Sequence, residues 1–157
     1  MRPLREIFEE LEDLLLNHRR TLDQNTGVPF VRLVYRPEEE PKCQRLGQSL
    51  SRTLGQKGVS VETVSCRGAI FAYYERTGRL EQLFEMESTE GERLSEHIAR
   101  RARRELVDRL LVAVERLGED GVIFLTETAF AYPYLSLSSV LEDCTNCIIP
   151  PMALVVF

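Results

Sequence analysis

Gly121-Val122-Ile123-Phe124-Leu125 is the stretch of sequence that decides the fold. A run that is apolar at nearly every position is typical of a buried strand in a parallel sheet that helices cover on both faces. Residues 152–157, Met-Ala-Leu-Val-Val-Phe, form a second run of this kind. Shorter β-rich runs at 30–35 and 59–64 predict two further strands. The sequence therefore predicts about four strands.

Segments with helical periodicity separate these runs. Apolar residues recur every three or four positions, with charged residues between them, over 4–17, from Pro37 to before Gly58, over about 69–86, over 92–117 and over about 135–141. Alternating strands and helices predict a Rossmann-like α/β fold, a three-layer sandwich whose sheet of about four strands is mostly parallel, with an amphipathic helix at the N-terminus.

Composition narrows the class of protein. The chain has 157 residues, of which 43% are hydrophobic and 29% charged, and no repeat or proline-rich linker divides it, so we expect a single domain over 1–157. No stretch approaches the roughly 20 apolar residues of a membrane span, and no apolar signal region opens the chain, so we expect a cytoplasmic protein without membrane contact. The net charge of -5 argues against a general nucleic-acid surface.

Function is expected at one edge of the sheet. In open parallel sheets, ligands and partners meet the carboxyl ends of the strands. The segments to inspect are those that follow Tyr35, Val64 and Leu125.

The turn after the first strand argues against a nucleotide cofactor. It reads Tyr35-Arg36-Pro37-Glu38-Glu39-Glu40, where three carboxylates would repel a phosphate, and no glycine-rich phosphate-binding motif occurs in the chain. These carboxylates and Glu127 could gather around a divalent cation, or they could be solvated groups that match a helix dipole. We expect neither a cofactor nor a metal.

Cysteines and histidines form no recognisable catalytic set. Cys144 and Cys147 have the spacing of a redox or zinc motif, but a zinc site needs a second pair, and Cys43 and Cys66 lie on different predicted elements. Neither His18 nor His97 lies in a candidate loop. We therefore predict reduced thiols and a protein that is not an enzyme.

Four arginines lie close together on the longest predicted helix. Arg100, Arg101, Arg103 and Arg104 fall opposite the apolar stripe, and Glu105 and Arg109 are spaced to form an ion pair. A solvated helix face accounts for this pattern, and the alternatives are an acidic protein partner or a nucleic acid.

An aromatic segment, Phe130-Ala131-Tyr132-Pro133-Tyr134-Leu135, follows the decisive strand. Aromatic side chains around a proline provide contact area at low entropic cost, which favours a binding surface. Capping of the core is the alternative.

These features together resemble the BrxB family of BREX (bacteriophage exclusion) systems. The resemblance is carried by the N-terminal helix, by the element Tyr35-x-Pro37-x-x-Glu40, and by Leu125-Thr126 followed by Tyr132-Pro133-Tyr134-Leu135 and Leu141. The chain departs from the family pattern at Glu127 and Ala129, where glycines are expected, and at Ser136 and Ser138, where an arginine and a histidine are expected. Family members also continue past the last strand, so Phe157 is expected to end a truncated or shortened chain.

The resemblance implies a non-catalytic accessory subunit of a phage-defence complex. Its expected partner is the PglZ protein, with the methyltransferase and the ATPase of the system as indirect partners. The predicted partner-binding residues are Tyr35, Pro37, Glu40, Tyr132, Pro133 and Tyr134. Two alternatives remain: a degenerate nucleotide- or metal-dependent enzyme that uses Glu40 and Glu127, and a nucleic-acid contact through the arginine face.

Overall fold

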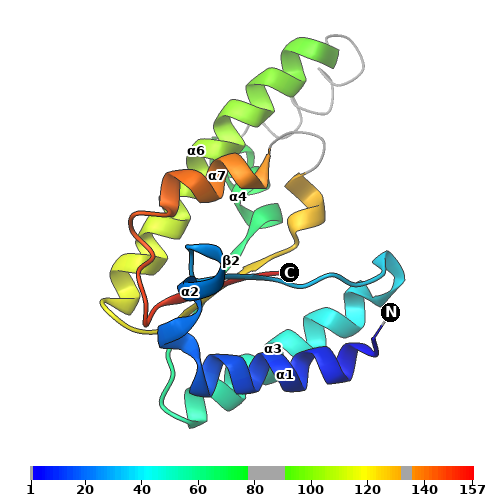
Figure 1. Cartoon of the computed structure of the whole chain (residues 1–157). Helices are drawn as coiled ribbons and strands as arrows, with labels where there is room; N and C mark the ends of the chain where they lie inside the picture. Colours follow the sequence, from blue (N-terminus) through cyan, green and yellow to red (C-terminus); the bar gives the residue numbers. More distant parts are fainter. Residues whose placement is uncertain (1, 78–90, 132–135) are drawn as a thin grey trace.

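Figure 1 shows the structure, a computed structural model of the chain in which residues 2–77, 91–131 and 136–157 are described. The described strands are β1 (Phe30–Arg32), β2 (Val61–Ser65), β3 (Val122–Thr126) and β4 (Ala153–Val156). The described α-helices are α1 (Leu4–Asn17), α2 (Asp23–Thr26), α3 (Glu40–Gln56), α4 (Cys66–Thr77), α6 (Gly91–Leu117) and α7 (Leu137–Cys144). Short 3-10 helices are η1 (Arg19–Thr21), η2 (Pro37–Glu39) and η3 (Thr128–Ala131).

The described strands form one parallel sheet in the order β1-β4-β3-β2. β4 is buried throughout and β3 at every position except its last, whereas β1 and β2 at the edges are only partly buried. The two most apolar runs of the sequence are therefore the two central strands. The predicted Rossmann-like α/β architecture with a parallel sheet is confirmed.

Helices cover both faces of this sheet. In Figure 1, α1 and α3 lie on one face, and α4, α6 and α7 lie on the other. Helix α3 connects β1 to β2, which lie at opposite edges, whereas the connections from β2 to β3 and from β3 to β4 join neighbouring strands. Successive strand residues point to opposite faces, so the same two central strands supply both cores.

The core on one face contains Phe124 and Val155 of the sheet, packed with the apolar stripes of α1 and α3. On the other face, Ile123 and Leu154 pack with α6 and α7, where Leu110 is fully buried. Burial of apolar surface at about 25 cal/mol per Å² is the main stabilising contribution to each layer.

Gly121 is required where α6 passes into β3. Its φ is +141°, and an added Cβ would lie 2.6 Å from Cδ2 of Leu117 and 2.9 Å from the carbonyl oxygen of Ser60. No other residue fits this approach without moving the backbone.

Most predicted boundaries differ from the observed ones by one or two residues, and larger differences occur at the end of β1, the start of α4 and the end of α7. The strand predicted over 30–35 leaves the ladder after the Leu33 N–H donates to the Val156 carbonyl at 2.9 Å, and the chain then turns into η2. Helix α4 begins at Cys66, earlier than predicted, because the Ser65 hydroxyl accepts a hydrogen bond from the Gly68 N–H at 3.0 Å and caps the helix. Helix α7 runs to Cys144 and not only to 141.

Among the helices of the described residues, none is long and apolar enough to cross a membrane.

Two adjacent leucines on α6 provide a test of the core between the sheet and helices α6 and α7. Leu110 is 0% exposed and Leu111 is 38% exposed. Replacing Leu110 by alanine leaves a cavity, so we expect Leu110→Ala to lower the free energy of unfolding by about 2–5 kcal/mol. The matched change Leu111→Ala should cost less than about 1 kcal/mol. Urea unfolding measures both, and equal losses would contradict the assignment of faces.

Candidate functional site

The element Tyr35-x-Pro37-x-x-Glu40 folds into a closed turn at the carboxyl end of β1. The Tyr35 hydroxyl donates a hydrogen bond of 2.5 Å to Oε2 of Glu40. Pro37 is the first residue of η2, where its fixed φ suits a helix start and its missing N–H leaves no donor unsatisfied. The structure thus brings together these three predicted residues within one turn.

Burial raises the pKa of the Tyr35 phenol well above its usual range, and the hydrogen bond to Glu40 raises it further. Tyr35 therefore stays protonated and acts as a donor. Glu40 also accepts a hydrogen bond of 3.3 Å at Oε1 from Nε2 of Gln44, one helical turn away. Each oxygen of the Glu40 carboxylate is thereby held by one neighbour.

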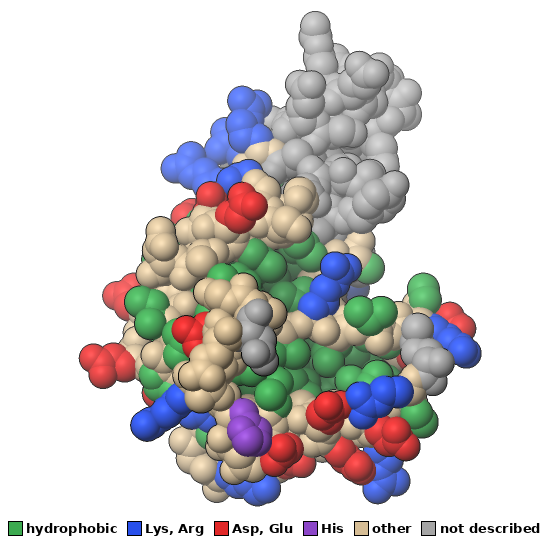
Figure 2. Space-filling model, in the orientation of Figure 1, with side chains coloured by type: hydrophobic (Ala, Val, Ile, Leu, Met, Phe, Trp, Pro, Cys, Tyr) green, Lys and Arg blue, Asp and Glu red, His purple; other side chains and the backbone are tan. Residues whose placement is uncertain are grey.

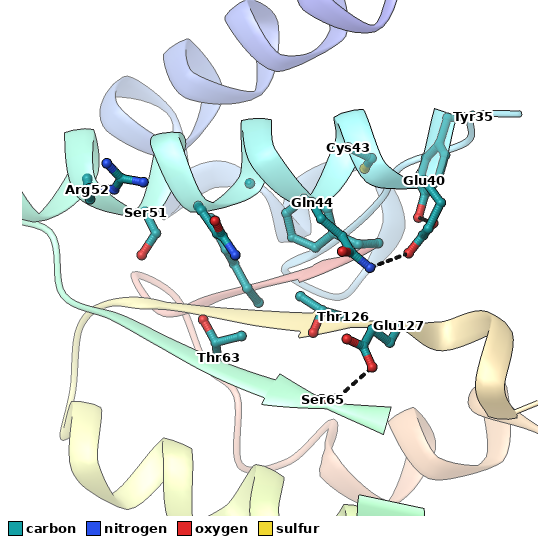
Figure 3. Close-up of a pocket in the computed structure, with 14 residues that line it drawn as sticks. Tyr35, Glu40, Cys43, Gln44, Ser51, Arg52, Thr63, Ser65, Thr126 and Glu127 are labelled. Carbon is teal, nitrogen blue, oxygen red and sulfur yellow. Dashed lines mark hydrogen bonds between the residues drawn. The ribbon is translucent and has the colours of Figure 1, made fainter. Parts of the chain in front are cut away.

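A cleft of about 540 Å³ opens beside this turn, between α3 and the carboxyl ends of β2 and β3 (Figure 3). It brings together the three segments that the parallel topology predicted to meet, represented by Tyr35, Ser65 and Glu127. Polar side chains of one face of α3 and of the strand ends form its walls, which are Glu40, Gln44, Gln48, Ser51, Arg52, Thr63, Ser65, Thr126 and Glu127.

The base of the cleft is aromatic. Phe124 and Phe157 both line it, with ring centroids 5.0 Å apart and an edge-on orientation. Phe157 packs against Gly47 of α3, where an added Cβ would lie 3.4 Å from the ring. The cleft therefore combines an apolar base with polar walls, as binding sites for small molecules commonly do.

Glu127 has an unusual backbone conformation. Its φ is +56°, a left-handed value that few residues other than glycine adopt. The Ser65 hydroxyl donates a hydrogen bond of 3.1 Å to Oε2 of Glu127, which links the ends of β2 and β3.

Of the acidic residues that could gather around a cation, only two lie at this cleft. Glu40 and Glu127 line the same cleft, but Glu38 and Glu39 do not. Glu39 accepts a hydrogen bond of 3.3 Å from the Arg36 N–H within η2. Within residues 2–77, 91–131 and 136–157, no group of three or more His, Cys, Asp or Glu side chains could hold a metal ion.

The two cysteines of the C-x-x-C sequence differ in exposure. Cys144 is buried at the end of α7, and Cys147 is exposed. Burial raises the pKa of the Cys144 thiol to about 11, and it raises the pKa of Cys43 to about 11 and that of Cys66 to about 12. These three thiols are protonated near neutral pH, and the sequence spacing alone does not reveal this difference in exposure.

The arginine face is partly engaged within the protein. Arg103 of α6 donates a hydrogen bond to Ser139 and forms a 2.5 Å ion pair with Asp143, both on α7. It therefore links α6 to α7. Arg100 and Arg104 are exposed, in agreement with the predicted solvated face. The predicted pair of Arg109 with Glu105 is present at 3.3 Å. Figure 2 shows positively charged side chains gathered toward this end of the molecule.

Several predicted residues fall elsewhere. His18 is exposed, with Nε2 3.6 Å from Asp13, as expected for a surface residue. The aromatic candidates Tyr132, Pro133 and Tyr134 lie outside the described residues, as does the side chain of His97.

Sequence reasoning missed most of the polar walls of the cleft. Gln44, Gln48 and Ser51 recur beside the buried stripe of α3, and this second, polar stripe is the signal that could have identified them. Ser65 carried a weaker signal, a hydroxyl residue at the junction of a strand and a helix.

In comparisons with protein-family models, with curated proteins and with solved structures, nothing matches the chain.

Removing the Tyr35 hydroxyl tests the closed turn. A hydrogen bond to a charged acceptor contributes more than a neutral one, so we expect Tyr35→Phe to cost about 1 kcal/mol or more of unfolding free energy. In a Glu40→Ala background the same change should cost almost nothing, because the acceptor is gone. A cost that is the same in both backgrounds would show that the two side chains are not coupled.

Thiol titration tests the assignment of the cysteines. An aromatic disulfide reagent at pH 7.5 should modify Cys147 rapidly, whereas the three buried thiols should react only after denaturation, because they are protonated and shielded. Cys147→Ser should abolish the rapid phase. Rapid reaction of a second thiol in the native protein would contradict this assignment.

Proposed function

We propose that this protein is a non-catalytic adaptor subunit of a BREX-type phage-defence complex, which acts in the cytoplasm and binds a PglZ-type protein. The methyltransferase and the ATPase of such a system would be indirect partners. The proposal rests on the motif resemblance and on one observation, an apolar hollow along the edge strand β1 beside the Tyr35 turn.

This hollow has a volume of about 660 Å³ and lies between β1, η3 and α7. Its apolar lining includes Phe30, Val34, Pro37, Leu137 and Leu141. Figure 2 shows hydrophobic side chains gathered in the middle of this face, between the layer of α1 and the layer of α7. Exposed apolar surface with a polar rim is typical of protein-binding sites.

Val34 is the most exposed large hydrophobic side chain of this region, at 63%. It directly precedes Tyr35, whose hydroxyl is held by Glu40. The hydrogen bond fixes the Tyr35 side chain before any partner binds. Such a side chain loses little conformational entropy when a partner docks, which raises the affinity. We therefore assign Val34 and the Tyr35 turn to the contact with the partner. Tyr132, Pro133 and Tyr134, which lie outside the described residues, stay predicted partner-binding residues.

One observation favours a second candidate, the degenerate metal- or nucleotide-dependent enzyme: Glu40 and Glu127 line the same cleft. Thermal stabilisation by Mg²⁺ or by a nucleotide would support it, since a ligand that binds only the folded state stabilises it. For the arginine face, a DNA complex that weakens steeply with salt would support a nucleic-acid contact.

Two exposed residues provide a matched test of the adaptor proposal. Val34 is 63% exposed, and Ile149 is 62% exposed before the amino end of β4. In co-expression with a PglZ-type protein, followed by size exclusion, Val34→Asp should abolish the stoichiometric complex, because a buried unpaired charge at a central contact weakens binding by roughly 30-fold or more. Ile149→Asp should leave the complex unchanged.

Two results would count against the proposal. The first is the absence of a complex between wild-type chains that are both folded. The second is an equal effect of the two aspartate substitutions, which would show that the partner does not bind at the β1 hollow.

A further inference from the structure

The cleft between α3 and the strand ends adjoins the β1 hollow to which the adaptor function is assigned, and the two share only Tyr35 and Phe157 among their lining residues. Of its walls, the adaptor proposal uses only Tyr35 and Glu40, as parts of the turn, and leaves Glu127, Ser51 and Arg52 unexplained. Its volume of about 540 Å³ lies within the range of roughly 300–1,000 Å³ that is usual for small-molecule sites. It also opens at the carboxyl ends of parallel strands, where open α/β sheets bind their ligands.

Two carboxylates line one end of this cleft. Figure 3 shows Glu40 on the α3 side and Glu127 on the sheet side, with Arg52 at the far end. Among the described residues, no Lys, Arg or His side chain lies within 4.0 Å of the Glu40 or Glu127 carboxylate oxygens. Within the described residues, neither carboxylate therefore has a cationic side chain in direct contact.

Hydrogen bonds orient both carboxylates but leave acceptor capacity. A carboxylate offers about four lone-pair sites. Glu40 uses two of them, for Tyr35 and Gln44, and Glu127 uses one, for Ser65. The remaining sites can accept N–H donors from a ligand, and hydrogen bonds of this charged kind are roughly twice as strong as neutral ones.

The surroundings favour an organic cation over a metal ion. Mg²⁺ and Ca²⁺ take about six or more oxygen ligands, part of them water, and they need free carboxylate oxygens, whereas hydroxyl and amide donors already occupy part of both carboxylates. The base of the cleft consists of Phe124 and Phe157, whose rings pack well against alkyl chains and attract cations. A metal ion would gain nothing from such a base.

We propose that this cleft binds a small organic cation, a primary ammonium or guanidinium group on a short apolar chain. The charged head lies between Glu40 and Glu127, and the chain lies over Phe124 and Phe157. Arg52 lies twelve residues along α3 from Glu40, about 18 Å at the rise of an α-helix, and it disfavours a second positive charge at the far end. The site therefore selects one cationic head with an uncharged tail.

The test is a titration of the isolated, ¹⁵N-labelled chain with butylammonium and butylguanidinium, monitored by amide chemical shifts. We expect saturable shifts at residues 40–52, 65 and 126–127, and no such shifts with 1-butanol, which has the same chain without a charge. Glu40→Gln and Glu127→Gln keep the oxygen that accepts from Tyr35 or Ser65 but remove the charge, so each should weaken binding about tenfold or more.

Matched variants separate the cleft from surface attraction. Glu38→Gln removes a carboxylate of η2 that does not line the cleft, and it should leave the affinity unchanged. Ser51→Phe fills the cleft without changing its charge and should abolish the shifts. Circular dichroism and thermal unfolding confirm that each variant is folded, and if Ser51→Phe does not fold, the two glutamine variants carry the test.

Several outcomes would overturn the proposal. They are the absence of saturable shifts in the wild-type chain, equal affinity in the Glu38, Glu40 and Glu127 variants, or displacement of the organic cation by millimolar Mg²⁺ with shifts at the same residues. None of these results depends on a partner protein, so they leave the adaptor proposal to its own test.

Discussion

The parallel pairing of β3 with β4 is the constraint on which the rest of the structure depends. Both strands are apolar at almost every position, and residues 122–125 pair with 153–156 in register. A strand that is apolar on both faces is stable only when a layer covers each face. The helices α1 and α3 on one side and α4, α6 and α7 on the other meet this requirement, and β1 and β2 are left as edges.

Parallel pairing also determines where polar chemistry can collect. All four strands end at the same edge, so residues far apart in the sequence, such as Tyr35, Ser65 and Glu127, become neighbours of one cleft. The side chains there are held by short-range bonds: Tyr35 to Glu40, and Ser65 to both Glu127 and the start of α4. The end of the sheet at which the strands finish therefore carries two cavities, an apolar hollow along β1 and a polar cleft under α3. The two can bind different partners.

The sequence predicted the fold class and the central elements well because their signals are strong. Long apolar runs and a 3.6-residue period are local signals that do not depend on how the elements pack. The predicted bounds of β3, β4, α1 and α6 therefore lie close to the observed ones. The strand order and the end of β1 depend on tertiary contacts, which no local pattern encodes. The polar walls of the cleft were missed for the same reason, since Gln44 and Ser51 become a site only when α3 lies over β2 and β3. The positive φ of Glu127 likewise follows from the turn after β3 and is not encoded by a local pattern.

The surface that we propose meets a partner is the carboxyl edge of the sheet beside β1. Amide hydrogen exchange of the chain, alone and in a co-purified complex with a PglZ-type protein, tests this assignment. We expect slower exchange at residues 33–40 in the complex, with unchanged exchange at 57–60 and 118–121, which precede the amino ends of β2 and β3. A complex that forms but protects these amino ends, or leaves 33–40 unchanged, would show that the partner binds elsewhere.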